Sequence, residues 1–239
     1  MKPAAMKVAV MQPYFFPYLG YFQLIAAVDN FIAWDDVQYI NRGWVNRNRI
    51  LLNGEPAYIT LPLEKAPQTA NINERRIADS AATAKKILGQ LHAAYRKAPH
   101  YAETRQLVED ILVYGEASLA LFLFNSLQKI SQHLGIATPL VLASTLQKND
   151  SGLTGSDRII AISKSVSATM YINSIGGREL YRADVFAAEN LELKFIEMAP
   201  VHYQQGSEDF VPYLSIIDVL MFNGRDITRQ YLQQYTLRD

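Results

Sequence analysis

The chain has 239 residues, of which 49% are apolar and 19% charged, and its formal net charge is zero. This composition is enough for a packed core and argues against disorder, while the charge balance argues against binding to nucleic acid or to an anionic membrane surface. The absence of cysteine excludes disulfides, thiolate metal sites and cysteine nucleophiles. No apolar run reaches the length of a membrane span and no secretory signal is visible at the N-terminus, so we expect a cytoplasmic protein without membrane insertion. Met1 and Met6 are both consistent with the start of the native chain.

The N-terminal stretch predicts the opening of a βαβ unit. An apolar run at 8–11 predicts a buried strand, and an amphipathic run at 21–28 predicts a helix. A loop containing two prolines and a glycine separates them, and a second apolar strand follows at 31–34. This order is typical of a parallel sheet, in which ligands bind beyond the carboxyl ends of the strands.

A hairpin and a helical segment come next. Asn53-Gly54 predicts a two-residue turn between antiparallel strands near 45–50 and 57–61, a pair that we expect to join the main sheet. Helical periodicity then begins at Ser80, which is the predicted cap of the first helix, and recurs in three helices that end at Gly135. We expect a single domain over residues 1–239, with a helical insert at about 80–135 that forms a lid or a second lobe.

The strand and helix alternation resumes after the insert. Strands are predicted at 139–143, 169–172 and 191–196, and helices at 154–166, around Val185-Phe186 and at 212–222, with a tail that is helical in part. The predicted fold class is therefore α/β: a Rossmann-like, mostly parallel sheet with an added β-hairpin and a helical insert.

The first candidate site is the loop after the first strand. Prolines and glycine fix its path, and a loop that leads into a helix N-terminus can bind phosphate or carboxylate, although neither the GxGxxG nor the P-loop pattern is present. An equally good interpretation is a tight turn whose aromatic side chains pack under neighbouring loops. The candidate ligand-binding residues here are Gln12, Pro13, Tyr14, Tyr18, Gly20 and Tyr21.

The second candidate site is the acidic pair at the end of the second strand. Asp35 and Asp36 are candidates for a divalent cation ligand, a partner of a sugar hydroxyl or a general base. The alternative is a helix cap or an ion-pair partner of Arg42 or Arg47. We predict catalytic roles for both acids and for Arg47, and we leave the cofactor open, Mg²⁺ with a nucleotide substrate included.

A mixed polar and aromatic segment follows the acids. Arginine suits phosphate or carboxylate, tryptophan offers a stacking surface and asparagine gives mixed hydrogen bonding, a combination that would suit a nucleotide or nucleotide-sugar. The alternative is an exposed hairpin with a solvated charged face. The candidate substrate-binding residues are Gln38, Tyr39, Arg42, Trp44, Asn46 and Asn48.

Two further segments carry polar detail. Ser174, Gly176 and Gly177 lie between a strand and a helix, as in an anion site, and we add Tyr181 to the candidate substrate-binding residues. Ser215 and Asp218 lie one helical turn apart, which suits a cap or a buried anchor better than catalysis. The four histidines lack metal-ligand spacing.

The same residues carry a family resemblance. The run from Met11 to Ile25, together with Asp29, Asp35 to Tyr39, Arg42 to Trp44 and Asn46 to Asn48, resembles the WbqC-like protein family. The segment from Tyr171 to Tyr181, with Ser215 to Asp218 and Asn223-Gly224, extends the resemblance over nearly the whole chain. It implies a place among bacterial surface-glycan genes, and it carries no catalytic residues over to this chain.

A fainter resemblance underlies the first. Residues 17–25, between two strands, look like the HxGH loop and helix of Rossmann-like nucleotidyltransferases, with Tyr18 and Tyr21 in place of the two histidines. This implies nucleotide-binding geometry without the histidine chemistry of that class. The functions left open are an O-antigen or other surface-polysaccharide transferase acting on a nucleotide-activated sugar or acyl group, a degenerate nucleotidyltransferase, and a non-catalytic nucleotide-sugar-binding protein. The oligomeric state stays open, a homo-oligomer included.

Overall fold

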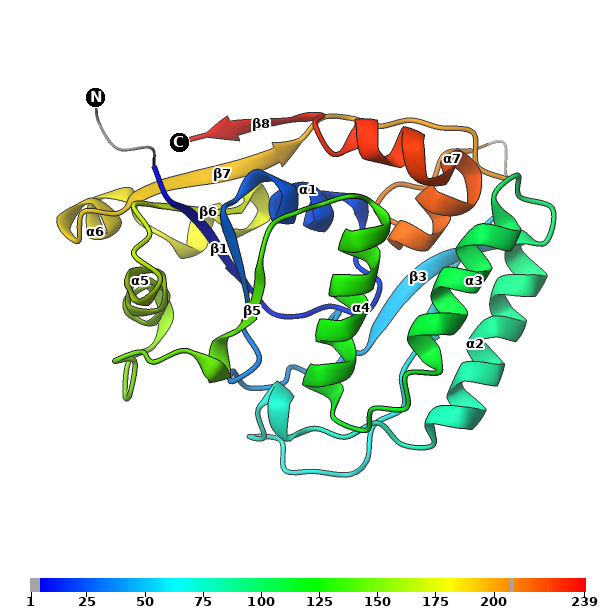
Figure 1. Cartoon of the computed structure of the whole chain (residues 1–239), viewed down its shortest axis with the longest axis horizontal. Helices are drawn as coiled ribbons and strands as arrows, with labels where there is room; N and C mark the ends of the chain where they lie inside the picture. The colour runs from blue at the N-terminus through cyan, green and yellow to red at the C-terminus, as the bar shows by residue number, and fades with distance from the viewer. Residues whose placement is uncertain (1–4, 207–208) are drawn as a thin grey trace.

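A mostly parallel sheet forms the centre of the structure, a computed structural model that describes residues 5–206 and 209–239 (Figure 1). Its strand order is β5-β2-β1-β6-β7-β8, in which the first five are parallel and β8 is antiparallel to β7. The strands are β1 (Lys7–Met11), β2 (Asn30–Ala33), β5 (Leu140–Leu142), β6 (Met170–Ser174), β7 (Glu192–Met198) and β8 (Tyr235–Arg238). The predicted Rossmann-like α/β class is confirmed.

Helices cover both faces of this sheet because side chains of a strand alternate between faces. On one face Ala9 and Ile172 pack in a core with α1 (Leu19–Ala27) and α7 (Ile216–Tyr231). On the other, Val8 and Val10 pack in a second core with α5 (Gly155–Ser165) and α6 (Ala183–Ala188). Strands buried on both faces read as continuous apolar runs, which is why the sequence predicted them well.

The hairpin stands apart from the main sheet. Strands β3 (Arg47–Leu52) and β4 (Glu55–Thr60) form their own two-stranded sheet, so the prediction that they join the main sheet was wrong. The turn itself is as predicted, since Asn53 and Gly54 both have positive φ (54° and 82°), as a type I′ turn requires. The outer edge of β3 serves another purpose, because the carbonyl oxygen of Arg49 accepts a hydrogen bond from the backbone N–H of Ser215 (2.9 Å).

The helical insert consists of α2 (Ser80–Tyr95), α3 (Tyr101–Leu112) and α4 (Leu119–His133), which stand side by side at one end of the molecule (Figure 1). A short 3₁₀ turn, η1 (Ile72–Glu74), precedes them. The cap of α2 is Asp79, whose carboxylate accepts from the N–H of Ala82, and not the predicted Ser80, which is the first helical residue. Buried side chains of all three helices belong to the same core as α1 and α7.

The C-terminal region departs most from the prediction. The last helix begins at Ile216 and not at residue 212, because Ser215 caps it through its hydroxyl oxygen. A kink at Gly224 (φ 66°, ψ −175°) is followed by more helix, which explains why Asn223-Gly224 looked like a helix end. Strand β8 was missed, since it is only four residues long and three of them are exposed.

The kink gives a test of the fold. Gly224→Ala is expected to lower the free energy of unfolding by about 3 kcal/mol, because only glycine tolerates this backbone conformation. The new Cβ would also lie 2.6 Å from the ring of His100. Urea unfolding measures the change, and Gly89→Ala is the control, since this exposed glycine of α2 has open space around it and alanine there should stabilise by up to about 1 kcal/mol. Equal stability of the two variants would contradict the interpretation.

Candidate functional site

The strand order defines a topological switch point. From β1 the chain proceeds to β2 and β5 on one side, whereas β6 and β7 continue on the other side of β1. The connections that follow β1 and β6 therefore diverge, and the crevice between them is where open α/β sheets bind ligands. Here the loop at 12–18 and the turn η3 (Ile175–Leu180) leave the sheet at the carboxyl ends of these two strands.

The loop after β1 is held by side chains from distant parts of the sequence. The amide of Asn48 donates to the carbonyl oxygens of Phe15 (3.0 Å) and Phe16 (2.9 Å), and the hydroxyl of Ser215 donates to the same Phe16 oxygen (2.8 Å). Both phenylalanines are fully buried, and Phe16 has φ 42°. The two phenylalanines thus pack in the core, as the tight-turn interpretation predicts, and ligand binding by this loop stays a prediction.

Tyr18 ends this loop, and its side chain is partly buried. It precedes the first turn of α1, which lacks a side-chain cap, and its ring lies across that turn. A Cβ on Gly20 would come within 2.4 Å of this ring, so glycine is required there for close approach. Tyr21, in contrast, is buried and donates its hydroxyl proton to the carbonyl oxygen of Gln12 (2.7 Å), which makes it part of the support.

Three cavities meet at Tyr18 and Tyr213, whose rings lie 6.1 Å apart, edge to face. We call the three together the aromatic cleft. The first, of about 340 Å³, lies at the switch point and is lined by Tyr18, Gly20, Gln23, Ser174, Ile175, Gly176, Ile196, Glu197, Met198 and Tyr213. The second, of about 370 Å³, is lined by Tyr18, Leu19, Met198, Pro200, Val201, His202, Tyr203, Phe210, Pro212, Tyr213, Leu214 and Val219. The third, of about 200 Å³, is lined by Tyr14, Pro17, Tyr18, Trp44, Asn48, Arg49 and Tyr213.

Sequence reasoning missed Tyr213 although a signal was present. The triplet Pro-Tyr-Leu occurs at 17–19 and again at 212–214, in each case just before a helix of the same sheet face. An isolated antiparallel bridge between Tyr18 and Ser215 joins the two segments, and it sets the two tyrosines side by side. Tyr213 is 63% exposed and has φ 57°, so this ring is presented outward by a strained backbone.

A buried carboxylate stands behind the wall of the second cavity. Asp218 accepts hydrogen bonds from the hydroxyls of Tyr203 (2.7 Å) and Tyr95 (2.8 Å) and from the amide of Gln205 (3.0 Å). Burial raises the pKa of Asp218, and it outweighs these three hydrogen bonds, which lower it. The predicted role as a buried anchor fits this position, since Tyr203 lines the cleft and Asp218 fixes its ring.

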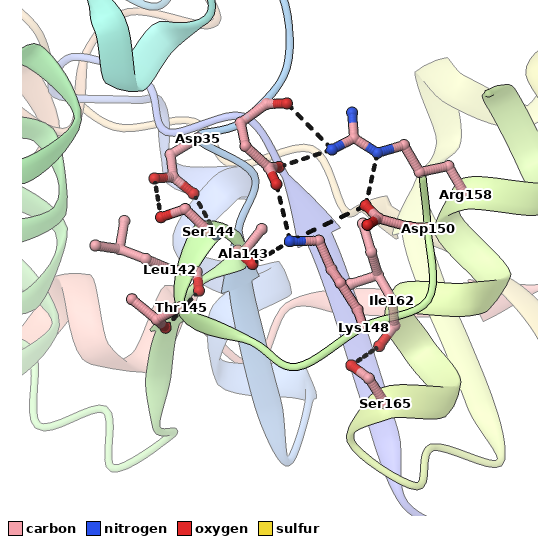
Figure 2. A network of polar contacts seen from close by, with 11 residues as sticks. Asp35, Leu142, Ala143, Ser144, Thr145, Lys148, Asp150, Arg158, Ile162 and Ser165 are labelled. Carbon is pink, nitrogen blue, oxygen red and sulfur yellow. Dashed lines mark hydrogen bonds and ion pairs between the residues drawn. The ribbon is translucent and has the colours of Figure 1, made fainter. Parts of the chain in front are cut away.

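The acidic pair lies at the same end of the sheet but outside the aromatic cleft. Asp35 is 1% exposed and accepts from both the N–H (2.9 Å) and the hydroxyl (2.6 Å) of Ser144, just after β5. Lys148, Asp150 and Arg158 gather beside it (Figure 2). Neither acid lines any of the three cavities of the cleft.

Asp36 takes part in that charged group. Its carboxylate lies 2.8 Å from Nζ of Lys148 and 3.1 Å from Nη2 of Arg158, which directs a hydrogen bond to the carbonyl oxygen of Asp36. Arg158 also binds Asp150 (2.8 Å). The carboxylates of the pair are thus already engaged by the protein, with cations other than the expected Arg42 and Arg47. A catalytic role for Asp35, Asp36 or Arg47 stays a prediction.

Some of the remaining predicted site residues hold neighbouring segments in place and do not line the cleft. Arg47 donates to the carbonyl oxygens of Arg42 and Gly43 and lies over the ring of Tyr58, so it braces the segment that carries Trp44. Tyr39 donates to Asn46, and Asn46 donates to the Leu61 carbonyl oxygen, away from the cleft.

Two more candidates are also tied elsewhere. Gln38 donates to the carbonyl oxygen of Gln68. Tyr181 packs on Tyr171 and Phe186 in the core of the opposite sheet face. Of the turn after β6, Ser174 and Gly176 reach the cleft, whereas Gly177 is buried against the Asn173 amide.

Residues 5–206 and 209–239 contain neither a metal-ligand cluster nor a helix that could span a membrane. That part of the chain contains no group of three or more histidine, aspartate or glutamate residues placed to hold a metal ion. It also contains no helix with the length and apolar character needed to cross a bilayer.

The fold and the cleft define a Rossmann-like α/β protein with a ligand-sized crevice at the switch point of its sheet. Comparison with known proteins adds a family: the chain belongs to the WbqC-like protein family, which it matches over residues 12–230. It is also 30% identical over 222 residues to a Mycobacterium tuberculosis protein described as "Uncharacterized protein Rv1507c", an alignment that covers 92% of this chain and 95% of that protein. No solved structure gives a significant match.

Removal of one acid tests the charged group beside β5. Asp36→Asn is expected to lower the free energy of unfolding by about 3 kcal/mol, because Lys148, only 7% exposed, loses its nearest carboxylate. Urea unfolding at neutral pH gives the value. Asp184→Asn is the matched control: its pair with Arg182 is exposed and its loss should leave stability unchanged. An unchanged free energy of unfolding in Asp36→Asn as well would show that the charged group has no structural role.

The raised pKa of Asp218 predicts a pH-dependent stability. Between its ordinary value of 3.8 and the raised value, the folded protein binds more protons than the unfolded chain. The free energy of unfolding contributed by this group therefore falls as pH rises through that window and is constant above it. Asp218→Asn should remove this slope, so the stability difference between variant and wild type should shift in favour of the variant as pH rises.

Urea unfolding at a series of pH values measures this difference. Asp226→Asn serves as the control, because Asp226 is an exposed acid of the same helix and its profile should run parallel to that of the wild type. A parallel profile for Asp218→Asn as well would contradict the assignment.

Proposed function

We propose that this protein is a transferase of bacterial surface-polysaccharide biosynthesis that takes a nucleotide-activated sugar or acyl donor. The observation that carries the proposal is the aromatic cleft, a set of three adjoining cavities at the switch point of a Rossmann-like sheet. Membership of the WbqC-like family supports the glycan context, because that family is associated with surface-glycan gene clusters.

Anionic groups of the donor have a place at the first cavity. The N-terminus of α1, without a side-chain cap, borders it through Tyr18 and Gly20, and the turn after β6 borders it through Ser174 and Gly176. A helix N-terminus carries the equivalent of about half a positive charge and free N–H groups, which favour a phosphate. The N-terminus of α7 lies alongside, since Ile216 donates to the carbonyl oxygen of Pro17 (2.9 Å). These dipoles allow a chain of zero net charge to attract a diphosphate.

The second cavity suits the transferred group and its acceptor. In a sugar transfer, the acceptor oxygen bonds to the donor carbon, the bond from that carbon to the diphosphate breaks, and the acceptor hydroxyl loses a proton. His202 lines this cavity with its ring 4.8 Å from that of Phe210. Imidazole is the side chain that most often accepts such a proton, so we assign His202 this role within the proposal.

A nucleotide screen tests the proposal. UDP, UDP-glucose, dTDP-glucose, CTP and ATP are each added with and without Mg²⁺, and one of them should raise the Tm by about 5–10 °C at a hundredfold excess over its Kd. Tyr213→Ala should lose this shift. Tyr114→Ala, which removes another exposed ring from the far end of the helical insert, should keep it.

The product then distinguishes the functions. Release of a nucleoside diphosphate in the presence of an acceptor supports the transferase, and its loss in His202→Gln supports the assigned base. Release of pyrophosphate instead would identify a nucleotidyltransferase, and binding without turnover would identify a binding protein. No shift with any nucleotide would refute the proposal.

A further inference from the structure

Arg49, which was absent from the predicted site residues, stands out in the third cavity. It lies in the middle of β3, and its neighbours Asn48 and Ile50 point to the buried side of the hairpin. Its own side chain is partly buried and lines a cavity with three tyrosines and Trp44. The guanidinium carbon lies 5.5 Å from the centre of the Trp44 ring.

This guanidinium has no acceptor within the part of the chain that the structure describes. Its Nε is buried without a hydrogen-bond partner, and the side chain takes part in no ion pair there. Arg47, two residues earlier, is by contrast satisfied by two backbone carbonyl oxygens. The third cavity is lined by no acidic side chain. A buried donor without an acceptor costs roughly 1–3 kcal/mol, and a ligand oxyanion in the cavity would remove this cost.

The backbone places Arg49 beside the first turn of α1. The carbonyl oxygen of Arg49 accepts from the N–H of Ser215, and the next residue, Ile216, donates to the carbonyl oxygen of Pro17, each at 2.9 Å. Ser215 and Ile216 thus lie between β3 and the segment that leads into α1. Tyr18 lines both the third cavity and the cavity at the helix N-terminus. Two elements that favour anions therefore border the same tyrosine.

We propose that Arg49 is an anion-binding residue of the cleft, in addition to the N-terminus of α1, and that it holds a phosphate group in the third cavity. A planar guanidinium can donate two parallel hydrogen bonds to phosphate oxygens, and it can stack on an aromatic ring such as that of Trp44. The identification of this phosphate with the diphosphate of a nucleotide donor rests on the proposed function. The phosphate chemistry itself does not, because it follows from an unpaired guanidinium in a cavity lined by no acid.

Calorimetry with inorganic pyrophosphate tests the site independently of any nucleotide. The wild type should bind it at low salt, and Arg49→Gln should bind it at least about tenfold more weakly, as expected for loss of a charge-assisted pair. Arg96→Gln removes the same charge from an exposed position at the end of α2, outside the candidate site, and should bind within about twofold of the wild type. Arg49→Lys, which keeps the charge but lacks the planar fork, should retain only part of the affinity.

The outcomes separate this proposal from the proposed function. Pyrophosphate binding that is absent, or equal in Arg49→Gln and the wild type, would overturn the role of Arg49. If Arg49→Gln fails to fold, an affinity of Arg49→Lys equal to that of the wild type would overturn it. UDP that binds more tightly than pyrophosphate, and depends on Arg49, would identify a nucleotide as the source of the phosphate. If pyrophosphate binding depends on Arg49 but no nucleotide binds, the anion site at Arg49 is supported and the proposal of a nucleotide donor is refuted.

Discussion

The carbonyl oxygen of Phe16 is the point on which the architecture of the site depends. It accepts hydrogen bonds from Asn48 on the hairpin and from Ser215 at the start of α7, although these residues are far apart in the chain. A buried carbonyl oxygen with two partners is strongly fixed, and here it fixes a loop residue with positive φ. Without these contacts the loop could not present Tyr18 across the first turn of α1.

The same contacts explain why the hairpin lies outside the main sheet. Its strand β3 connects two other segments through hydrogen bonds. The side chain of Asn48 donates to the loop after β1, and the carbonyl oxygen of Arg49 accepts from the N–H of Ser215. Three distant segments thus converge at the carboxyl end of β1, and each contributes a wall of the aromatic cleft. A site built this way gains rigidity from the scaffold, while the rings of Trp44 and Tyr213 remain exposed.

Local patterns were sufficient to predict most of the fold. Apolar runs marked the parallel strands, Asn53-Gly54 marked the hairpin turn, and helical spacing marked the three helices of the insert. The site was less predictable, because residue type alone cannot show which polar group is already satisfied. Asp36 and Arg47 looked like functional groups and have partners within the protein, whereas Arg49, in the same segment as Arg47, has none among the described residues. Strand β8 depends on pairing with β7, a long-range contact that a short exposed segment does not reveal.

The buried carboxyl of Asp218 has a mechanical consequence. It accepts a hydrogen bond from Tyr95 of α2, and the hydroxyl of Tyr95 in turn accepts one from the N–H of Leu51 on β3. It also accepts a hydrogen bond from Tyr203, which lines the cleft. If the helical insert moved away from the cleft, this buried carboxylate would lose the hydrogen bond from Tyr95. The insert therefore supports the aromatic cleft from behind, and part of the rigidity of the cleft comes from helices that do not line it.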